Sequence, residues 1–199
     1  MKAAPAERHP AYHHGDLRAA LIQEGLRELA VARGDDLSLR EIARAVGVSA
    51  NAVYRHFPDK AALMAALAEE GLDRLAEAQR QAAASAPKGI TALTASGRAY
   101  VRFALANPAL FRLIFSAAAS PARLDARGQE RAAFTLLKTH MKQAGHTDRD
   151  DKTATIRRLR AWSTVHGLAM LMLDNQIPPD AALIDAVISP TRTLRPKQA

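Results

Sequence analysis

The spacing of apolar residues limits the fold of this 199-residue chain more than any other feature. Leucine and alanine recur at helical intervals, as in Leu17, Leu21 and Leu29, and no stretch alternates apolar and polar residues with period two. A period near 3.6 is typical of amphipathic helices, whereas a period of two is typical of half-buried strands. The sequence therefore predicts an all-α fold.

Helix-ending residues divide the pattern into nine expected helices. Proline and glycine mark the breaks, for example at Asn107-Pro108, Ser120-Pro121 and Pro178-Pro179. The expected ranges are roughly 16–32, 39–45, 50–56, 60–84, 90–106, 108–117, 122–144, 150–175 and 180–189. The long fourth helix joins a small N-terminal group of three helices to a larger helical bundle.

The second and third helices are short and have clear end signals. Ser38 followed by Glu41 is a capping box, in which the hydroxyl accepts from the third amide while the carboxylate reaches back. Gly47 suits the left-handed backbone that ends a helix, and Ser49 is an N-cap for the next one. Two helices joined by a short glycine-containing turn form the outline of a helix-turn-helix.

The residues of this window also carry a family resemblance. Ser38-Leu-Arg-Glu-Ile-Ala, Gly47-Val-Ser and Tyr54-Arg-His-Phe-Pro-Asp-Lys60 closely resemble the DNA-binding domain of the TetR family of transcriptional regulators. Tyr12-His-His-Gly-Asp-Leu-Arg18 is similar to the start of many members. Trp162-Ser163 and His166-Gly167 resemble a C-terminal subgroup named for its Trp-His-Gly signature. The resemblance covers residues 12–64 well and the remainder weakly.

This resemblance implies a DNA reader, and the residue types suit that role. The N-terminal end of a recognition helix meets base edges, so the short side chains of Ala50 and Ala52 allow close approach. Asn51 can donate and accept toward adenine, and the resemblance makes His56 and Lys60 phosphate contacts. Arg55 can read a guanine or hold a phosphate. The predicted DNA-binding residues are Ser38, Arg40, Ser49, Ala50, Asn51, Ala52, Tyr54, Arg55, His56 and Lys60.

For the C-terminal part, the resemblance implies an effector-binding and homodimerisation domain. The candidate effector pocket consists of Phe103, Phe111, Phe115, Phe134, Trp162 and His166, although each is also explained as plain bundle core. The candidate dimer face consists of Leu168, Leu171, Met172, Leu183, Ile184 and Val187. The expected organisation is a tail at 1–11, a DNA-binding domain at 12–60, an effector and dimer domain at 61–190 and a basic tail at 191–199.

Net charge contributes less to this interpretation than its total suggests. The formal charge of +8 favours an anionic partner such as double-stranded DNA. However, residues 1–80 hold 11 Lys and Arg against 12 Asp and Glu, whereas residues 81–199 hold 17 against 8. The DNA-binding prediction therefore depends on the motif. The excess positive charge of the C-terminal half either belongs to a solvated face or gives the effector site a preference for an acidic ligand.

Other function classes fit the sequence less well. The longest apolar run, Leu168 to Leu173, is far short of the roughly 20 residues of a membrane span, and cysteine is absent. We therefore expect a cytoplasmic protein without membrane partner, metal or cofactor. A small helical enzyme is one alternative, but Ser163 near His166 lacks the other groups of a catalytic site. A helix-turn-helix protein without an effector is the other alternative.

Overall fold

A computed structural model describes residues 17–31, 37–87, 91–116 and 151–189, and these ranges contain eight helices and no strand. The helices are α1 (Leu17–Val31), α2 (Leu39–Val46), α3 (Ala50–His56), α4 (Lys60–Ala84), α5 (Ala92–Ala106), α6 (Pro108–Ile114), α8 (Asp151–Leu173) and α9 (Ala181–Ile188). The predicted all-α fold is confirmed. The helix expected at 122–144, with Phe134, and both predicted tails lie outside the described residues.

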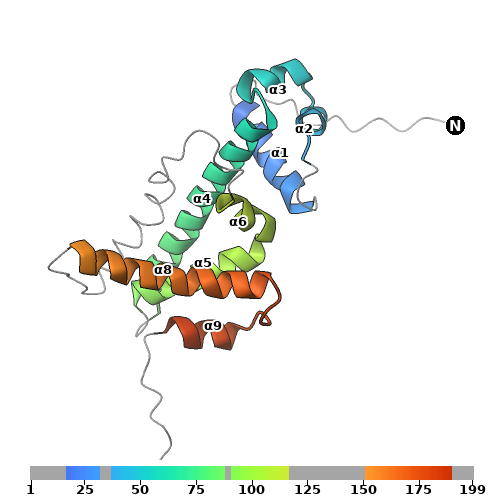
Figure 1. Ribbon diagram of the computed structural model, residues 1–199. Coiled ribbons are helices and arrows are strands. Elements are labelled where there is room, and N and C mark those ends of the chain that lie inside the picture. Colours follow the sequence, from blue (N-terminus) through green and yellow to red (C-terminus); the bar gives the residue numbers. More distant parts are fainter. Residues whose placement is uncertain (1–16, 32–36, 88–90, 117–150, 190–199) are drawn as a thin grey trace, which may run out of the picture.

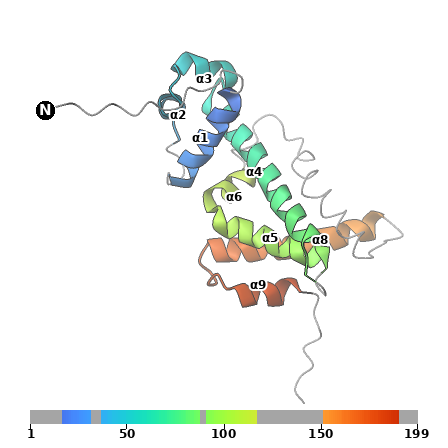
Figure 2. The same cartoon turned by 180° about the vertical axis from the view of Figure 1, so that it is seen from behind.

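The helices form two groups joined by α4. Figure 1 shows α1, α2 and α3 gathered at one end, while α5, α8 and α9 lie around the far end of α4. At 1.5 Å per residue, the 25 residues of α4 span about 37 Å. The reverse view in Figure 2 shows α6 between the α1 group and α5, and α6 contacts both α1 and α4. The N-terminal unit is therefore joined to the rest through α4 and α6 together.

The core beneath the N-terminal helices extends into α6. Leu21 of α1, Ile42 of α2 and Val53 of α3 are fully buried against the first half of α4. Ile114 of α6 belongs to the same apolar cluster and is also fully buried. At Gly71 a Cβ atom would lie 2.6 Å from Leu110 Cδ1, so a larger residue there would force the buried Leu110 side chain at the α4–α6 crossing to move.

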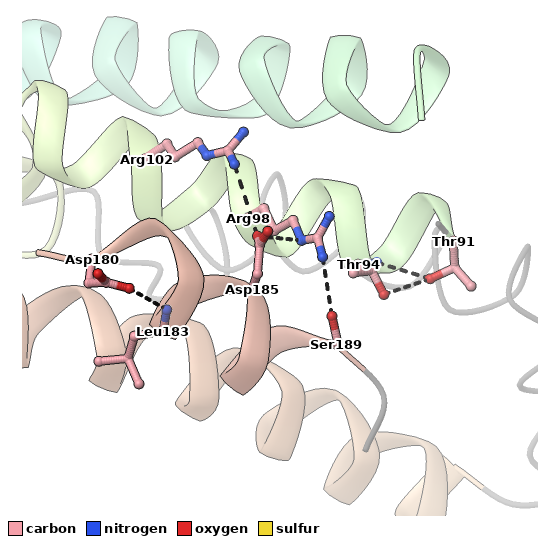
Figure 3. A network of polar contacts seen from close by, with 8 residues as sticks. All are labelled: Thr91, Thr94, Arg98, Arg102, Asp180, Leu183, Asp185 and Ser189. Carbon is pink, nitrogen blue, oxygen red and sulfur yellow. Dashed lines mark hydrogen bonds and ion pairs between the residues drawn. The ribbon is translucent and has the colours of Figure 1, made fainter. Parts of the chain in front are cut away.

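A second core holds the C-terminal helices together. Leu75 near the middle of α4, Val101 of α5 and Met172 of α8 are buried in it, together with Ile184 of α9. Polar contacts fasten α9 onto α5 at its edge, as Figure 3 shows. Asp185 Oδ1 lies 2.9 Å from Arg98 Nε and 4.0 Å from Arg102 Nη2, and Arg98 also donates to the Ser189 hydroxyl at 3.2 Å. The position of α9 is therefore set by both apolar packing and charge.

The ends of the short helices confirm the predicted signals at Gly47 and Ser49 but not the one at Ser38. Ser49 Oγ accepts from the Ala52 amide at 3.3 Å, and Asp59 Oδ1 accepts from the Ala62 amide at 2.7 Å. The predicted Ser38 capping box is wrong, because the Ser38 side chain makes no cap hydrogen bond. The Glu41 carboxylate lies 3.7 Å from Arg44 Nη2, so its charge is paired along α2. Ser38 begins α2 through its backbone carbonyl, which accepts from the Ile42 amide at 3.0 Å.

Candidate DNA-binding surface and ligand site

The turn between α2 and α3 is fixed by its backbone. Gly47 has φ +78° and ψ 31°, in the left-handed region that favours glycine. Its amide donates to the Arg44 carbonyl at 3.1 Å, and the Val48 amide donates to the Ala43 carbonyl at 2.9 Å. These two bonds close the end of α2 as a Schellman motif. Because Ser49 then caps α3 at once, the angle between the two short helices is set by local contacts.

Helix α3 has one anchored side and one open side. Val53 is fully buried, and Phe57 just after the helix is only 2% exposed. The side chains on the open side are Asn51, Tyr54, Arg55 and His56, and Tyr54 is 41% exposed. Four polar or basic side chains are thus presented together on a short helix whose other side is held by the core.

The remaining predicted DNA-binding residues fall into three groups. Arg40, Ser49 and Lys60 are exposed, and Ser38 and Ala50 are half-buried. Ala52 is a correction, because its side chain is only 8% exposed and leaves little surface for a base edge. The sequence does not distinguish the two sides of a seven-residue helix that has alanine on both. Arg18 of α1 was not predicted, and its guanidinium carbon lies 5.6 Å from the Phe57 ring centroid.

Four of the predicted pocket residues form an aromatic cluster between α6 and α8. The Phe115 ring lies 4.8 Å from the His166 ring, 5.0 Å from Phe111 and 6.4 Å from Trp162, measured between centroids. Phe111 is fully buried, whereas Phe115, Trp162 and His166 are half-buried. Phe103 packs at the edge of both cores, and its ring contacts no other aromatic ring among the described residues. The cluster therefore has a closed side at Phe111 and an accessible side.

Tyr100 of α5 completes this cluster, and the sequence analysis missed it. Its ring meets Phe111 edge to face at 5.4 Å, and its side chain is 2% exposed. Trp162 Nε1 donates to the Tyr100 hydroxyl at 3.3 Å, and the hydroxyl lies 2.9 Å from His166 Nδ1. Burial raises the pKa of Tyr100 and lowers the pKa of His166. The one available signal was the spacing of Tyr100 and Phe103, which places two aromatic residues on neighbouring turns of α5.

A separate groove of about 950 Å³ lies between the two groups of helices. Gln23 and Glu24 of α1, Arg74 of α4 and Asn107 before α6 line it. Glu24 is buried and forms an ion pair with Arg27, and Arg74 Nη2 donates to Gln23 at 2.6 Å. The predicted pocket residues are not among the groove's lining, so the groove and the aromatic cluster are different places.

The predicted dimer face is divided by the structure. Leu168, Met172 and Ile184 are corrections, because they are 6%, 2% and 3% exposed and pack inside the chain's own second core. Leu171, Leu183 and Val187 are exposed, as are Ile156 and Leu159, which the sequence analysis did not select. Both sides of α8 are apolar, and sequence alone did not show which side faces inward.

Comparisons with known proteins agree with this arrangement. Residues 22–67 match the model of the bacterial regulatory proteins of the tetR family, and residues 93–189 match the tetracyclin repressor-like C-terminal domain. A solved structure of a protein of unknown function from Rhodococcus sp. RHA1 is 32% identical, covers 90% of this chain and 93% of its own, and superposes with a TM-score of 0.71.

Two further solved structures are similar. A tetR-family transcriptional regulator from Streptomyces coelicolor is 25% identical with a TM-score of 0.63, covering 86% of this chain and 78% of its own. A TetR family transcription regulator from Marinobacter aquaeolei VT8 covers 86% and 91%, and its TM-score of 0.60 at 22% identity supports the fold alone.

The anchored α2–turn–α3 unit and its open basic side define a helix-turn-helix DNA-binding regulator. More specifically, the chain belongs to the TetR family of transcriptional regulators, which is not a family of enzymes. The Trp-His-Gly subgroup remains a prediction. No described helix is long and apolar enough to cross a membrane. The described ranges also contain no group of three or more His, Cys, Asp or Glu residues arranged to hold a metal ion.

Proposed function

We propose that this regulator represses transcription as a homodimer on a palindromic operator, in the cytoplasm where bacterial DNA lies, and that a small-molecule effector releases it. The observation that carries the proposal is the presentation of Asn51, Tyr54, Arg55 and His56 on the open side of α3, opposite buried Val53. A helix held in this way can enter the major groove with its N-terminal end toward the bases. Asn51 is then the base reader, because its amide both donates and accepts.

Phosphate contacts would fix the position of α3 on the duplex. Tyr54 and His56 are exposed farther along α3, and exposed Lys60 begins α4 just after the Asp59 cap. Arg40 is exposed near the start of α2 and flanks the same surface. Contacts of this kind supply affinity and register without distinguishing one sequence from another. The modest charge of the N-terminal half is sufficient, because only a few correctly placed donors are needed.

The apolar side chains exposed on α8 and α9 support the homodimer. Ile156, Leu159 and Leu171 on α8 and Val187 on α9 are all more than 40% exposed. A Cβ atom added at Gly167 of α8 would have no neighbour within 4 Å among the described residues, so the contacts between the described helices do not require a glycine there. A second copy of α8 approaching closely would use that space. Two-fold symmetry would then place two α3 helices on one face of DNA, one turn or a multiple of it apart.

Helix α6 offers a route from the effector site to the DNA-binding unit. Phe111 belongs to the aromatic cluster, whereas its neighbours Leu110 and Ile114 belong to the core beneath α1–α4. A ligand that moves α6 at Phe111 must therefore also move residues packed against α4 at Gly71. Effector and DNA then favour different positions of the same helix, and each weakens the binding of the other.

Genomic fragments retained by the purified full chain, followed by sequencing, test the DNA-binding half of this proposal. We expect one palindromic sequence to be enriched, and fluorescence anisotropy of a labelled duplex to report its affinity. Leu171→Asp is expected to produce a monomer in sedimentation and to weaken binding to the palindrome more than to a half-site. A Leu183→Asp variant provides a second substitution at the same face. If the retained DNA fragments share no sequence, sequence-specific regulation is contradicted.

A DNA-binding protein without an effector remains the second candidate. The aromatic cluster with the hydrogen-bonded Tyr100, Trp162 and His166 favours effector binding, because ligand sites between the helices of a bundle combine aromatic side chains with a few polar groups. Thermal melting across a metabolite collection distinguishes the two. A regulator with an effector should be stabilised by at least one compound that also lowers its affinity for the labelled operator. Stabilisation without loss of DNA affinity would favour the second candidate.

A further inference from the structure

The order of donors and acceptors among Trp162, Tyr100 and His166 determines which hydrogen-bonding group the aromatic cluster can offer to a ligand. The indole Nε1 of Trp162 can only donate, so the Tyr100 oxygen accepts from it. The proton of the Tyr100 hydroxyl then needs an acceptor, and His166 Nδ1 lies 2.9 Å away. Among the described residues, the Tyr100 hydroxyl has hydrogen bonds to Trp162 and His166 only. The Tyr100 side chain is 2% exposed.

The opposite direction is unfavourable. If His166 Nδ1 carried the hydrogen and donated to Tyr100, the hydroxyl would accept twice and its own proton would be buried without a partner. Leaving a buried donor unsatisfied costs on the order of 1–3 kcal/mol. The pKa changes agree with the first direction, because burial keeps Tyr100 protonated and keeps the His166 ring neutral. His166 Nδ1 is therefore the acceptor, and the hydrogen of the neutral ring is on Nε2.

The surroundings of His166 are aromatic. Phe115, Phe111 and Trp162 place their ring centroids 4.8, 5.6 and 5.9 Å from that of His166. His166 as a whole residue is half-buried, so part of it is accessible. The site thus offers flat apolar surfaces and one hydrogen-bond donor, Nε2–H, held in place by Tyr100 and Trp162.

We propose that this cluster binds a flat apolar molecule that carries a neutral hydrogen-bond-acceptor oxygen, such as a ketone carbonyl, and that His166 Nε2–H recognises this oxygen. The inference rests on the proposed function, since it assigns a ligand class to the proposed effector site. A neutral acceptor suits a neutral donor among aromatic rings, because a carboxylate would lose its hydration there. Stacking against Phe115 and Trp162 would favour a planar body.

Three probes of one shape test the ligand class: naphthalene, 2-acetonaphthone and 2-naphthoate. Trp162 is the single tryptophan of the chain, so one indole Nε1–H resonance in the NMR spectrum of the full-length protein reports occupancy of this site. We expect the ketone to shift that resonance and to bind about tenfold more tightly than the hydrocarbon, as one added hydrogen bond allows. The carboxylate should bind more weakly than the ketone.

Substitutions test whether His166 causes the preference for the ketone over the hydrocarbon. His166→Phe should bring the ketone-to-hydrocarbon affinity ratio close to one, whereas Thr164→Ala, on the exposed side of the same helix, should keep it. Long-range proton–nitrogen spectra of the imidazole should show a protonated Nε2 and an unprotonated Nδ1, and Tyr100→Phe should mix the two tautomers. Tautomer assignment requires no ligand, so it remains informative even if His166→Phe folds poorly.

Several outcomes would overturn the ligand class: equal binding of ketone and hydrocarbon, tightest binding of the carboxylate, an unshifted indole resonance with all three probes, or a protonated Nδ1. Measuring the affinity for the labelled operator with each probe present distinguishes a failure of the ligand class from a failure of the proposed effector release. A ketone preference that leaves DNA affinity unchanged supports the ligand class and contradicts effector release. A compound that releases DNA without disturbing Trp162 supports effector release and contradicts the ligand class.

Discussion

The two halves of this regulator are specified in different ways. In the N-terminal unit, the turn at Gly47 and the caps at Ser49 and Asp59 depend on residues within five positions of one another. In the C-terminal half, the central hydroxyl of Tyr100 depends on partners 62 and 66 positions away, Trp162 and His166. Local signals therefore shape the DNA reader, whereas the aromatic cluster exists only after α5, α6 and α8 have packed.

The halves nevertheless share one helix. Ile114 of α6 is buried in the core of the N-terminal unit, and Phe111 of α6 is buried in the aromatic cluster. The fold thus combines a locally defined DNA reader with a packing-dependent aromatic cluster, and α6 contributes buried residues to both. Substitutions in either half therefore show whether the effect stays within that half.

Ile114→Ala and Met172→Ala should have the largest effects. Each removes a fully or almost fully buried side chain and should lower the free energy of unfolding by about 2–5 kcal/mol. Ile114 supports the N-terminal unit, whereas Met172 lies in the second core. Urea denaturation measures the stability of each variant. At a temperature where both variants are folded, we expect weaker operator binding for Ile114→Ala only, and an equal loss would remove the distinction between the cores.

Gly47→Ala should act on the DNA reader alone. A Cβ atom at Gly47 meets nothing within 4 Å, so the cost comes from φ +78°, which disfavours alanine by about 1–2 kcal/mol. Relaxation of the turn would tilt α3, and operator affinity should fall more than stability does. Anisotropy with the labelled operator and thermal melting measure the two effects. A variant with unchanged DNA affinity would show that the turn angle is not critical.

The two serines before α2 and α3 differ in the structure and should differ in stability. Ser49→Ala removes a side-chain cap and should cost about 1 kcal/mol, whereas Ser38→Ala removes none and should cost little. Chemical denaturation of both variants under the same conditions measures the difference. An equal loss of unfolding free energy in the two variants would support the capping box that the sequence predicted at Ser38.

Stability against pH should show the smallest effect, in the C-terminal half. Because burial lowers the pKa of His166 in the fold, the unfolded chain binds the proton first as pH falls below about 6.5. The free energy of unfolding should therefore decrease from pH 7.5 to 5.5, and His166→Gln should flatten part of that decrease. Above pH 7.5 the ring is neutral in both states and contributes no slope. A steeper decrease in the variant would contradict this sign.

Much of the fold was predictable from sequence, because helix periods and end signals are local. The sequence predicted the order of the described helices and the roles of Gly47 and Ser49 at their ends. It misplaced Ala52, Leu168, Met172 and Ile184, since a helix that is apolar on two sides does not show which side another helix covers. Tyr100 was missed for a related reason: its role is defined by partners on α8, far along the chain.

Base preference measured for Asn51→Ala and Lys60→Ala tests the central assignment of α3 most directly. Selection from a randomised duplex library, followed by titration at several salt concentrations, gives both specificity and the number of phosphate contacts. We expect Asn51→Ala to relax preference at one position of each half-site, at a cost of about 1–3 kcal/mol. Lys60→Ala should weaken binding to all sequences about equally and reduce the salt slope by about 1. Identical behaviour of the two variants, with preference unchanged in both, would contradict the placement of α3 in the major groove.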